Sequence, residues 1–321
     1  MEQEKMVFQT KMKKNNRTIL TVLFVFCFFT LLAAINGCQS NGNNTTNSSF
    51  ENSNKKPAEV TNKPNALPED NLTSDTVTVP EQVLFEQSGV KLTLKSLEDG
   101  MLGSELKVLV ESSNDAPVTV QVRDCSVNNH MFNSVIFSSN VASGKKNNDA
   151  IKFMSSQLTE NGIKTLGTIE LSFHVFNSDT WDTIFDTETI TIKTSVADRV
   201  SQPPLEEKTI VFEQDGIEIS FVDFDTDSFW GQDIKIYIEN NSNTAITVQA
   251  RDTSINGFMI DGTMSCDVMP EKMANTTLSF FKSSLEDNGI ESIESVELKF
   301  HIFEKDSWDT IVDTDIIKIE K

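Results

Sequence analysis

The sequence has few of the residues that most often carry catalysis or bind metals. Its 321 residues include three histidines, four cysteines and a single tyrosine. No Gly-x-Ser-x-Gly, His-Glu-x-x-His, phosphate-binding or Cys-x-x-Cys motif occurs. His174 and His301 lie in strand-like segments whose sequence supplies no nucleophile or metal ligand beside them. We therefore expect a protein without catalytic activity, and rank an envelope enzyme last among the functions considered.

Basic residues are also scarce. The chain has 27 Lys and Arg against 48 Asp and Glu, which gives a net charge of −21. Such a chain is repelled by nucleic acid and by anionic lipid surfaces, so we exclude a nucleic-acid partner. The acid is uneven, because residues 83–196 hold nine basic and 14 acidic residues whereas residues 209–321 hold eight and 23.

The four cysteines do not form the pattern of a disulfide framework. Cys27 lies in an N-terminal apolar run and Cys38 ends it, which leaves Cys125 and Cys266, one in each half of the chain. A disulfide framework needs pairs within a small domain. We expect both of these cysteines to be ordinary buried or half-buried thiols.

The N-terminal segment has the layout of a secretion signal. Basic residues precede an apolar run at 18–35, which is followed by Asn36, Gly37 and Cys38. The end of this run resembles the lipobox of bacterial lipoproteins, in which the signal is cut before a cysteine whose thiol is acylated. The resemblance implies a signal peptide at 1–37 and a lipid on Cys38. The alternative is an uncleaved membrane anchor, and both interpretations place the remaining chain on the outer, extracellular face of the bacterial cytoplasmic membrane.

Residues 38–82 have the composition of a tether. The segment is rich in Asn, Ser and Thr, contains four prolines and has almost no large apolar residue. It cannot bury enough surface to offset the entropy lost on ordering, so we expect disorder there.

Two long segments of the chain repeat each other. FEQSG at 85–89 matches FEQDG at 212–216, VTVQVRD at 118–124 matches ITVQARD at 246–252, and SDTWDTIFDT at 178–187 matches KDSWDTIVDT at 305–314. The copies are offset by 127 or 128 residues. A duplicated domain explains the repeat.

Each copy has the pattern of a β-sandwich. Apolar residues alternate with polar ones in short segments separated by turns, as in 169–175, where Ile169, Leu171, Phe173 and Val175 share one face. One helical turn is expected at 155–161 and again at 283–288. The predicted fold is all-β, with two tandem immunoglobulin-like β-sandwich domains at 83–196 and 209–321, joined by a linker at 197–208.

The residues of the repeat also suggest a family. Both copies carry a hairpin with the pattern Asp-x-Ser-Val/Ile-Asn, at 124–128 and 252–256. Both also end on a Phe-His-x-Phe strand followed by Trp-Asp-Thr-Ile. With the lipobox and the tether, this resembles the immunoglobulin-like domains of uncharacterised Gram-positive lipoproteins. The resemblance implies a fold and a cell-surface location, and it implies no particular activity.

The repeated Trp-Asp-Thr phrase is the first candidate binding site. It follows a strand and precedes the last strand of each copy, so it forms a loop at one end of the sandwich. Tryptophan with several aspartates suits a cationic or sugar ligand. A structural role is the alternative, because Asp and Thr close turns and Trp can fill the open end of a core. The candidate residues are Asp179, Trp181, Asp182, Asp186, Asp306, Trp308, Asp309 and Asp313.

An acidic segment at 223–231 is the second candidate site. Asp223, Asp225 and Asp227 stand at every second position, a spacing found in calcium-binding loops. The segment differs from an EF-hand, because Ser228 and Ile234 stand where Gly and Glu are needed. A solvated acidic loop, or a partner-binding tip that uses Phe229 and Trp230, is the alternative to a calcium site.

These observations predict a membrane-anchored, cell-surface binding or scaffolding lipoprotein. Its expected partners are the membrane, through the lipid on Cys38, and a surface protein or polysaccharide. The alternative function is a lipoprotein that captures or senses a cationic solute or calcium. No other cofactor is expected.

Overall fold

The computed structural model describes residues 76–132, 135–225 and 231–321. The predicted signal peptide, Cys38 and the tether as far as residue 75 lie outside these ranges, as do Asp227, Phe229 and Trp230. Nothing in the described part of the chain is a helix long and apolar enough to cross a membrane.

The described chain consists almost entirely of strands, which confirms the predicted all-β class. The first half contains the elements β1 (Gln82–Gln87), β2 (Val90–Gly100), β3 (Gly103–Ser112), β4 (Val118–Val127), β5 (His130–Met131), β6 (Ser138–Val141), β7 (Lys146–Met154), α2 (Ser155–Glu160), β8 (Thr168–Asn177), β9 (Thr183–Asp186), β10 (Ile190–Lys193) and the 3-10 helix η1 (Ala197–Arg199).

The second half repeats this order of elements. It contains β11 (Thr209–Gln214), β12 (Ile217–Asp225), β13 (Gly231–Asn240), β14 (Ile246–Ile255), β15 (Phe258–Met259), β16 (Ser265–Val268), β17 (Lys272–Phe281), α3 (Lys282–Asp287), β18 (Ser295–Glu304), β19 (Thr310–Asp313) and β20 (Ile317–Glu320). The two helical turns, α2 and α3, fall where the sequence predicts them.

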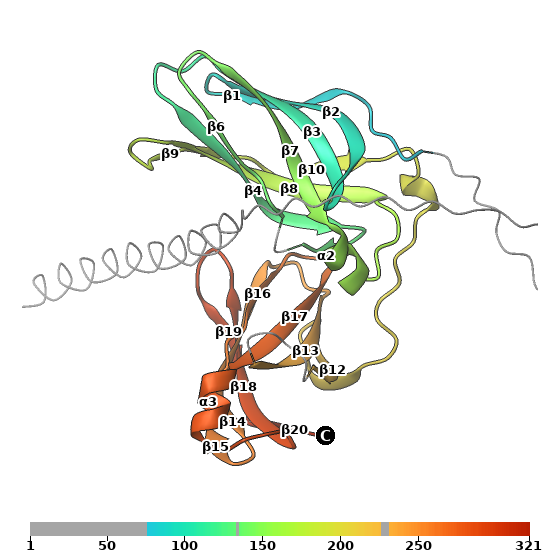
Figure 1. Ribbon diagram of the computed structural model, residues 1–321, viewed down its shortest axis with the longest axis vertical. Coiled ribbons are helices and arrows are strands. Elements are labelled where there is room, and N and C mark those ends of the chain that lie inside the picture. Colours follow the sequence, from blue (N-terminus) through green and yellow to red (C-terminus); the bar gives the residue numbers. More distant parts are fainter. Residues whose placement is uncertain (1–75, 133–134, 226–230) are drawn as a thin grey trace, which may run out of the picture. The chain divides into compact units, whose positions relative to one another are not determined.

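In each half, two sheets pack face to face over a hydrophobic core. In the first half, one sheet has the order β1-β2-β3-β7, and the facing strands are β10-β8-β4 with β6 and β9 beside them. Figure 1 shows β1, β2 and β3 together in one layer. In the second half β11-β12-β13-β17 face β14 and β18 with their short neighbours. The described chain thus has sandwich-like sheets, as expected from the alternating sequence.

The period-2 pattern of the sequence explains which side chains enter the cores. Ile169, Leu171, Phe173 and Val175 of β8 are all completely buried, so the predicted inward face is confirmed. The corresponding residues of β18 are buried in the second core. Cys125 is buried in the first core and Cys266 in the second.

The two halves also share their irregularities. The pairing of β4 with β8 shifts register between Arg123 and Ser126, and the pairing of β14 with β18 shifts between Arg251 and Ser254. Asp124 and Asp252, which lie within these bulges, both have positive φ values, 46° and 51°. The duplication therefore preserves the bends as well as the strands.

The segments that enter and leave the first half are bonded to each other. The Thr78 N–H donates to Ser195 Oγ at 3.1 Å, and the Ser195 N–H donates to the Thr78 carbonyl at 2.8 Å. Val79 packs against the first core just before β1 begins at Gln82. We call the Thr78–Ser195 pair the entry clamp.

One sheet passes from the first half to the second. The short strand β5 pairs with β4 and, in parallel, with β17 of the second half, so that a ten-stranded sheet contains strands of both halves. Met131 of β5 is buried with the second core rather than the first. Residues 71–321 accordingly form one compact unit.

Candidate functional site

The first Trp-Asp-Thr loop is closed by its own backbone. The Trp181 N–H donates to the Asn177 carbonyl, and the Asn177 N–H donates to the Asp182 carbonyl, both at 2.9 Å. The Asn177 side-chain oxygen accepts from the N–H groups of Asp179 and Thr180, at 2.9 and 3.2 Å. This tight turn holds Trp181 in the left-handed region, with φ at 65°.

The second loop has the same backbone with different side chains. The Trp308 N–H donates to the Glu304 carbonyl and the Glu304 N–H to the Asp309 carbonyl, again at 2.9 Å. Glu304 replaces the asparagine, and its carboxylate accepts from the Ser307 hydroxyl at 2.6 Å. The φ value of Trp308 is 67°. The unusual conformation of the tryptophan is therefore kept although the side chains that close the turn differ.

Each tryptophan lies on a stack of aromatic rings on the outer surface of the sheet. The Trp181 ring packs on the Phe176 ring with centroids 5.4 Å apart and planes 16° apart. Phe176 also stacks with His174, with ring centroids 5.2 Å apart. Trp181 is 61% exposed whereas Phe176 is buried, so the tryptophan covers the phenylalanine and presents a face to solvent.

The second half builds the same stack. Trp308 packs on Phe303 at 5.3 Å and 17°, and Phe303 packs on His301 at 5.1 Å. Trp308 is 55% exposed. Neither tryptophan fills the end of a core, so that part of the structural alternative is wrong. We call the two stacks the Trp platforms.

An acidic residue ends each platform. His174 Nδ1 lies 2.6 Å from Asp186 Oδ1 on β9, and His301 Nδ1 lies 2.6 Å from Asp313 Oδ1 on β19. The two aspartates are exposed. Each platform therefore runs from an exposed carboxylate through an imidazole to an exposed indole.

Arg123 lies close to the first of these aspartates. Burial lowers the pKa of Arg123, while the negative charges of Asp124 and Asp186 act in the opposite direction. The Arg123 guanidinium donates to the Gln121 side-chain oxygen at 2.8 Å, and Arg251 makes the same contact with Gln249 at 3.1 Å. The strand beside each platform thus offers amide and guanidinium groups as well as carboxylates.

The structure brings four of the eight predicted residues of the repeated phrase to the platforms, namely Trp181, Trp308, Asp186 and Asp313. Asp186 and Asp313 contact the histidines, and the four other aspartates, Asp179, Asp182, Asp306 and Asp309, are exposed on the two loops. Sequence reasoning missed the phenylalanines and histidines as members of the site. The repeated Phe-His-x-Phe that precedes each loop could have indicated them, because alternate residues of one strand share a face.

The acidic segment does not form a metal site in its described part. The Asp223 carboxylate accepts from the Phe224 N–H at 2.8 Å, and Asp225 forms an ion pair with Lys235 at 3.2 Å. Asp227, Phe229 and Trp230 lie outside the described residues. Across the described ranges, no group of three or more His, Cys, Asp or Glu side chains is arranged to hold a metal ion.

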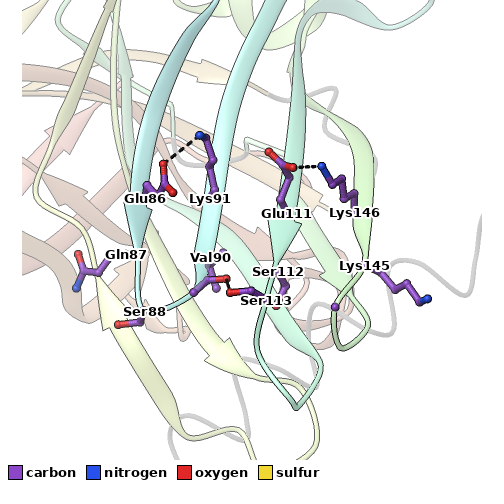
Figure 2. A pocket seen from close by; sticks show the side chains of 12 residues that line it. Glu86, Gln87, Ser88, Val90, Lys91, Glu111, Ser112, Ser113, Lys145 and Lys146 are labelled. Carbon is purple, nitrogen blue, oxygen red and sulfur yellow. Dashed lines mark hydrogen bonds and ion pairs between the residues drawn. The ribbon is translucent and has the colours of Figure 1, made fainter.

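A depression of about 380 Å³ lies at the end of the β1-β2-β3-β7 sheet. Figure 2 shows that its walls carry two ion pairs, Glu86 with Lys91 at 3.0 Å and Glu111 with Lys146, while the Lys145 side chain extends away from them. It is an open and polar surface feature whose acidic groups are already paired. It gives little support to the capture of a small cationic solute.

Comparisons with known proteins add no family. No family model matches the chain, and no curated protein matches it significantly. Among solved structures, the YadV chaperone has 9% identity and a TM-score of 0.22, with 68% of this chain and 92% of the chaperone covered. Red sea bream transglutaminase has 11% identity and a TM-score of 0.21, and the match covers 73% of this chain and 31% of the transglutaminase. A protein of unknown function from Porphyromonas gingivalis has 11% identity and a TM-score of 0.18, and the match covers 70% of this chain and 93% of that protein. Likenesses with such TM-scores carry no argument about function.

Proposed function

We propose that the protein is a membrane-anchored, cell-surface lipoprotein that binds an extracellular polymer through its two Trp platforms and has no catalytic activity. The anchor is a lipid on Cys38, at the end of the predicted signal peptide. The binding part of the proposal is carried by one observation, the presence of an exposed tryptophan in a strained conformation at the same place in both halves.

The strain argues for a role beyond folding. A non-glycine residue in the left-handed region costs roughly 1–2 kcal/mol, and such conformations gather at binding and catalytic sites. Because both tryptophans are more than half exposed, burial returns only part of this cost. An indole held flat on a second ring, and open to solvent on its other face, has the geometry of a stacking surface.

The chemistry around the platforms favours a neutral or amine-bearing polysaccharide. Sugar rings offer C–H faces that pack on an indole and hydroxyl groups that donate to carboxylates. Asp182, which follows Trp181 in the loop, and Asp186, which contacts His174, supply such acceptors, and they repel anionic polymers. An amino group would gain from both the carboxylates and the indole face. A basic segment of a surface protein offers part of the same chemistry and is the other outcome of the test.

The binding test uses the 71–321 unit, which contains both cores and both platforms. Cell-wall polysaccharide is incubated with the wild-type unit, with each single variant Trp181→Ala and Trp308→Ala, and with the double variant. We expect weaker co-sedimentation for each single variant and a larger loss for the double variant, because two linked sites reinforce each other. Met101→Ala is the matched control, since Met101 is apolar and 98% exposed but lies outside the platforms.

The outcomes separate the ligand classes. If wild type and the double variant co-sediment equally, the platforms do not bind the polysaccharide. If the wild type binds basic surface proteins and no polysaccharide, and the double variant loses this binding, the ligand is a polypeptide. If the wild type and the double variant bind equally to every surface fraction, the proposal is contradicted.

The anchor has a separate test in cells. Radioactive palmitate should label the wild-type protein, and Cys38→Ala should remove the label because no thiol remains at the predicted processing site. Cys27→Ala is the control and should keep the label. A labelled Cys38→Ala protein would refute the lipoprotein assignment.

A further inference from the structure

The two halves of the chain meet along an edge of β17. The Met273 N–H donates to the Asn129 carbonyl at 2.9 Å, which is the contact that joins β5 to the ten-stranded sheet. Beside it, the Asn275 side chain donates to the Asn161 side-chain oxygen at 3.0 Å. The first residues of β17, on the edge opposite to β13, are therefore covered by the first half, whereas Ser279 further along this edge pairs with Thr263 of the second half.

Charged and apolar contacts complete this junction. Lys272 forms an ion pair with Glu170, and both side chains are largely shielded from solvent. The His130 ring lies 6.3 Å from the Tyr237 ring, and Met131 enters the second core. His130 and Met131 are each only 3% exposed, and their contacts with Tyr237 and the second core contribute to this burial.

The repeat places the same docking element on the second half, where the described chain leaves it uncovered. Strand β15 occupies the position of β5, with Phe258 in place of His130 and Met259 in place of Met131. Phe258 is 49% exposed and Met259 72% exposed. Two adjacent large apolar side chains at the tip of a hairpin are costly to hydrate and are typical of interaction sites.

The first half, in turn, carries an uncovered copy of the β17 edge. Lys146 has the same register against Glu111 of β3 that Met273 has against Glu239 of β13. The N–H of Lys146 therefore points outward along the edge, as the N–H of Met273 does. Within the described residues, β7 pairs only with β3 and, at Lys152, with Ile136. The first residues of β7 therefore form an open edge that can accept a strand.

The chemistry of the two uncovered surfaces matches at the equivalent positions. In the repeat, Lys145 is equivalent to Lys272, and Glu297 is equivalent to Glu170. The side chains of Lys145 and Glu297 are exposed, and neither forms an ion pair among the described residues. The other equivalent pairs are Asn148 with Asn288, Leu109 with Phe258, and the Lys146 N–H with the Gly257 carbonyl. Charge, amide, apolar and backbone contacts would therefore all be repeated.

We propose that the protein associates with itself head to tail, so that strand β15 of one chain docks on the edge of β7 in the next chain. This contact repeats the one inside each chain, where β5 docks on the edge of β17. The interface is heterologous, because the surface that each copy donates differs from the surface that it accepts. Such contacts build rings when the rotation closes and filaments when it does not. The proposal goes beyond polymer binding and depends on neither the lipid nor the Trp platforms.

The intermolecular contact should be weaker than the one inside the chain. The ion pair of Lys305 with Asp124, at 2.9 Å, has no equivalent, because Ser178 occupies the position of the lysine and Asp252 already pairs with Lys299. The halves of one chain are also held at a high effective concentration by their linker, and separate molecules lack this advantage. Association should therefore depend on protein concentration.

The first experiment is sedimentation velocity on the 71–321 unit over its full range of soluble concentration. We expect the weight-average sedimentation coefficient of the wild type to rise with concentration. Lys145→Glu and the double variant Phe258→Ser/Met259→Ser should each lose this rise. The charge-swapped chain Lys145→Glu/Glu297→Lys should regain it, because the pair is restored with reversed signs.

A mixing experiment tests the head-to-tail geometry. Lys145→Glu damages only the accepting surface, and Phe258→Ser/Met259→Ser damages only the donating surface. An equal mixture of the two retains one intact contact per pair, so it should form dimers and nothing larger, although each variant alone stays monomeric. An interface between two identical surfaces limits the wild type itself to dimers, so wild-type species larger than a dimer, together with a mixture that stops at the dimer, identify the head-to-tail contact.

Two controls separate the contact from general effects of charge and hydrophobicity. Lys193→Glu alters an exposed lysine on β10, and Met101→Ser removes an exposed apolar side chain, and both should associate as the wild type does. A wild type that stays monomeric at every concentration overturns the proposal. So does association that survives in the Lys145 and Phe258/Met259 variants.

Discussion

At the scale of single residues, the two left-handed tryptophans are the most informative positions. Their φ values differ by only 2°, although the side chains that close their turns are Asn177 in one loop and Glu304 in the other. The shared conformation is therefore fixed by the backbone contacts of the turn. Its consequence is the flat stacking of an indole on a buried phenylalanine.

The strain at Trp181 predicts an unusual order of stabilities. Trp181→Gly removes both the ring and the strain, whereas Trp181→Ala removes the ring and keeps a Cβ in the left-handed region. We expect the alanine variant of the 71–321 unit to be about 1 kcal/mol less stable than the glycine variant in urea unfolding. An indole that filled a core would instead make both variants lose roughly 3–5 kcal/mol relative to wild type.

His130 predicts a specific pH dependence. Burial lowers the pKa of His130, although the Asn128 backbone and the charge of Glu239 act against this, and its Nδ1 has no hydrogen-bond partner among the described residues. Because the pKa in the folded state lies below the unfolded value of about 6.5, the unfolded state binds more protons as the pH falls. The stability linked to His130 is therefore complete above about pH 6.5 and is lost as the pH falls toward the folded pKa.

The variant His130→Phe isolates this effect, because the second half has Phe258 at the same position. Thermal unfolding of both proteins between about pH 8 and 5 should show the melting temperature of the wild type falling relative to that of the variant. Comparing the two cancels the titration of the many carboxylates. Parallel curves would show that His130 is not held neutral by burial.

At the scale of elements, a close approach of two strands fixes a glycine at the start of β3. A Cβ on Gly103 would lie 2.0 Å from the Phe153 carbonyl oxygen, and the φ value of Gly103 is 146°. Gly144 also has a positive φ, 63°, but a Cβ there would meet nothing within 4 Å. A side chain at Gly103 would therefore meet both backbone strain and steric overlap, whereas one at Gly144 would meet backbone strain alone.

This difference can be measured with two alanine variants. Gly103→Ala should lower the free energy of unfolding by the backbone strain and by about 1–3 kcal/mol more from overpacking, because a backbone carbonyl has to move. Gly144→Ala should cost only about 1 kcal/mol, which is the strain alone. Chemical denaturation of the 71–321 unit measures both, and equal losses would contradict the close approach at Gly103.

The elements also show how far the sequence could predict this protein. Strands such as β8 could be predicted because four alternating apolar residues define a buried face. Strand β5 could not, since two residues have no period, and its partner β17 lies more than 140 residues away. The aspartates and tryptophans of the platforms could be predicted from the repeated phrase. The contribution of Phe176 could not, because a phenylalanine in a strand is normally taken as core.

At the scale of the whole molecule, the two cores predict that each half can fold alone. Residues 76–199 and 200–321 should each give a cooperative thermal transition. Both should melt below the intact unit, since separation exposes His130 and Met131 on one side and Tyr237 on the other. Differential scanning calorimetry checks this, and the absence of a transition in both halves would show that the division into two domains is wrong.

The acidic second half predicts a response to salt. Residues 209–321 have 23 acidic against eight basic residues, so counterions should stabilise them by screening. Asp225 already pairs with Lys235, and we therefore expect calcium chloride and sodium chloride to raise the melting temperature of the 71–321 unit equally at matched ionic strength. A larger shift with calcium than with either sodium or magnesium would instead support a specific calcium site.

The entry clamp has a mechanical consequence. The chain enters the first half at Thr78 and leaves it at Ser195, and these two residues are hydrogen bonded to each other. Tension applied along the chain on either side of this half therefore meets the clamp before it reaches the strands between them. Residues 79–194 form a loop closed by the clamp, so load that travels along the backbone bypasses them while the clamp holds. Load that arrives through the linker can thus pass to the residues before Thr78 without stretching the first core or the Trp181 platform on its surface, whereas load that arrives through the junction of β5 with β17 enters the first half directly.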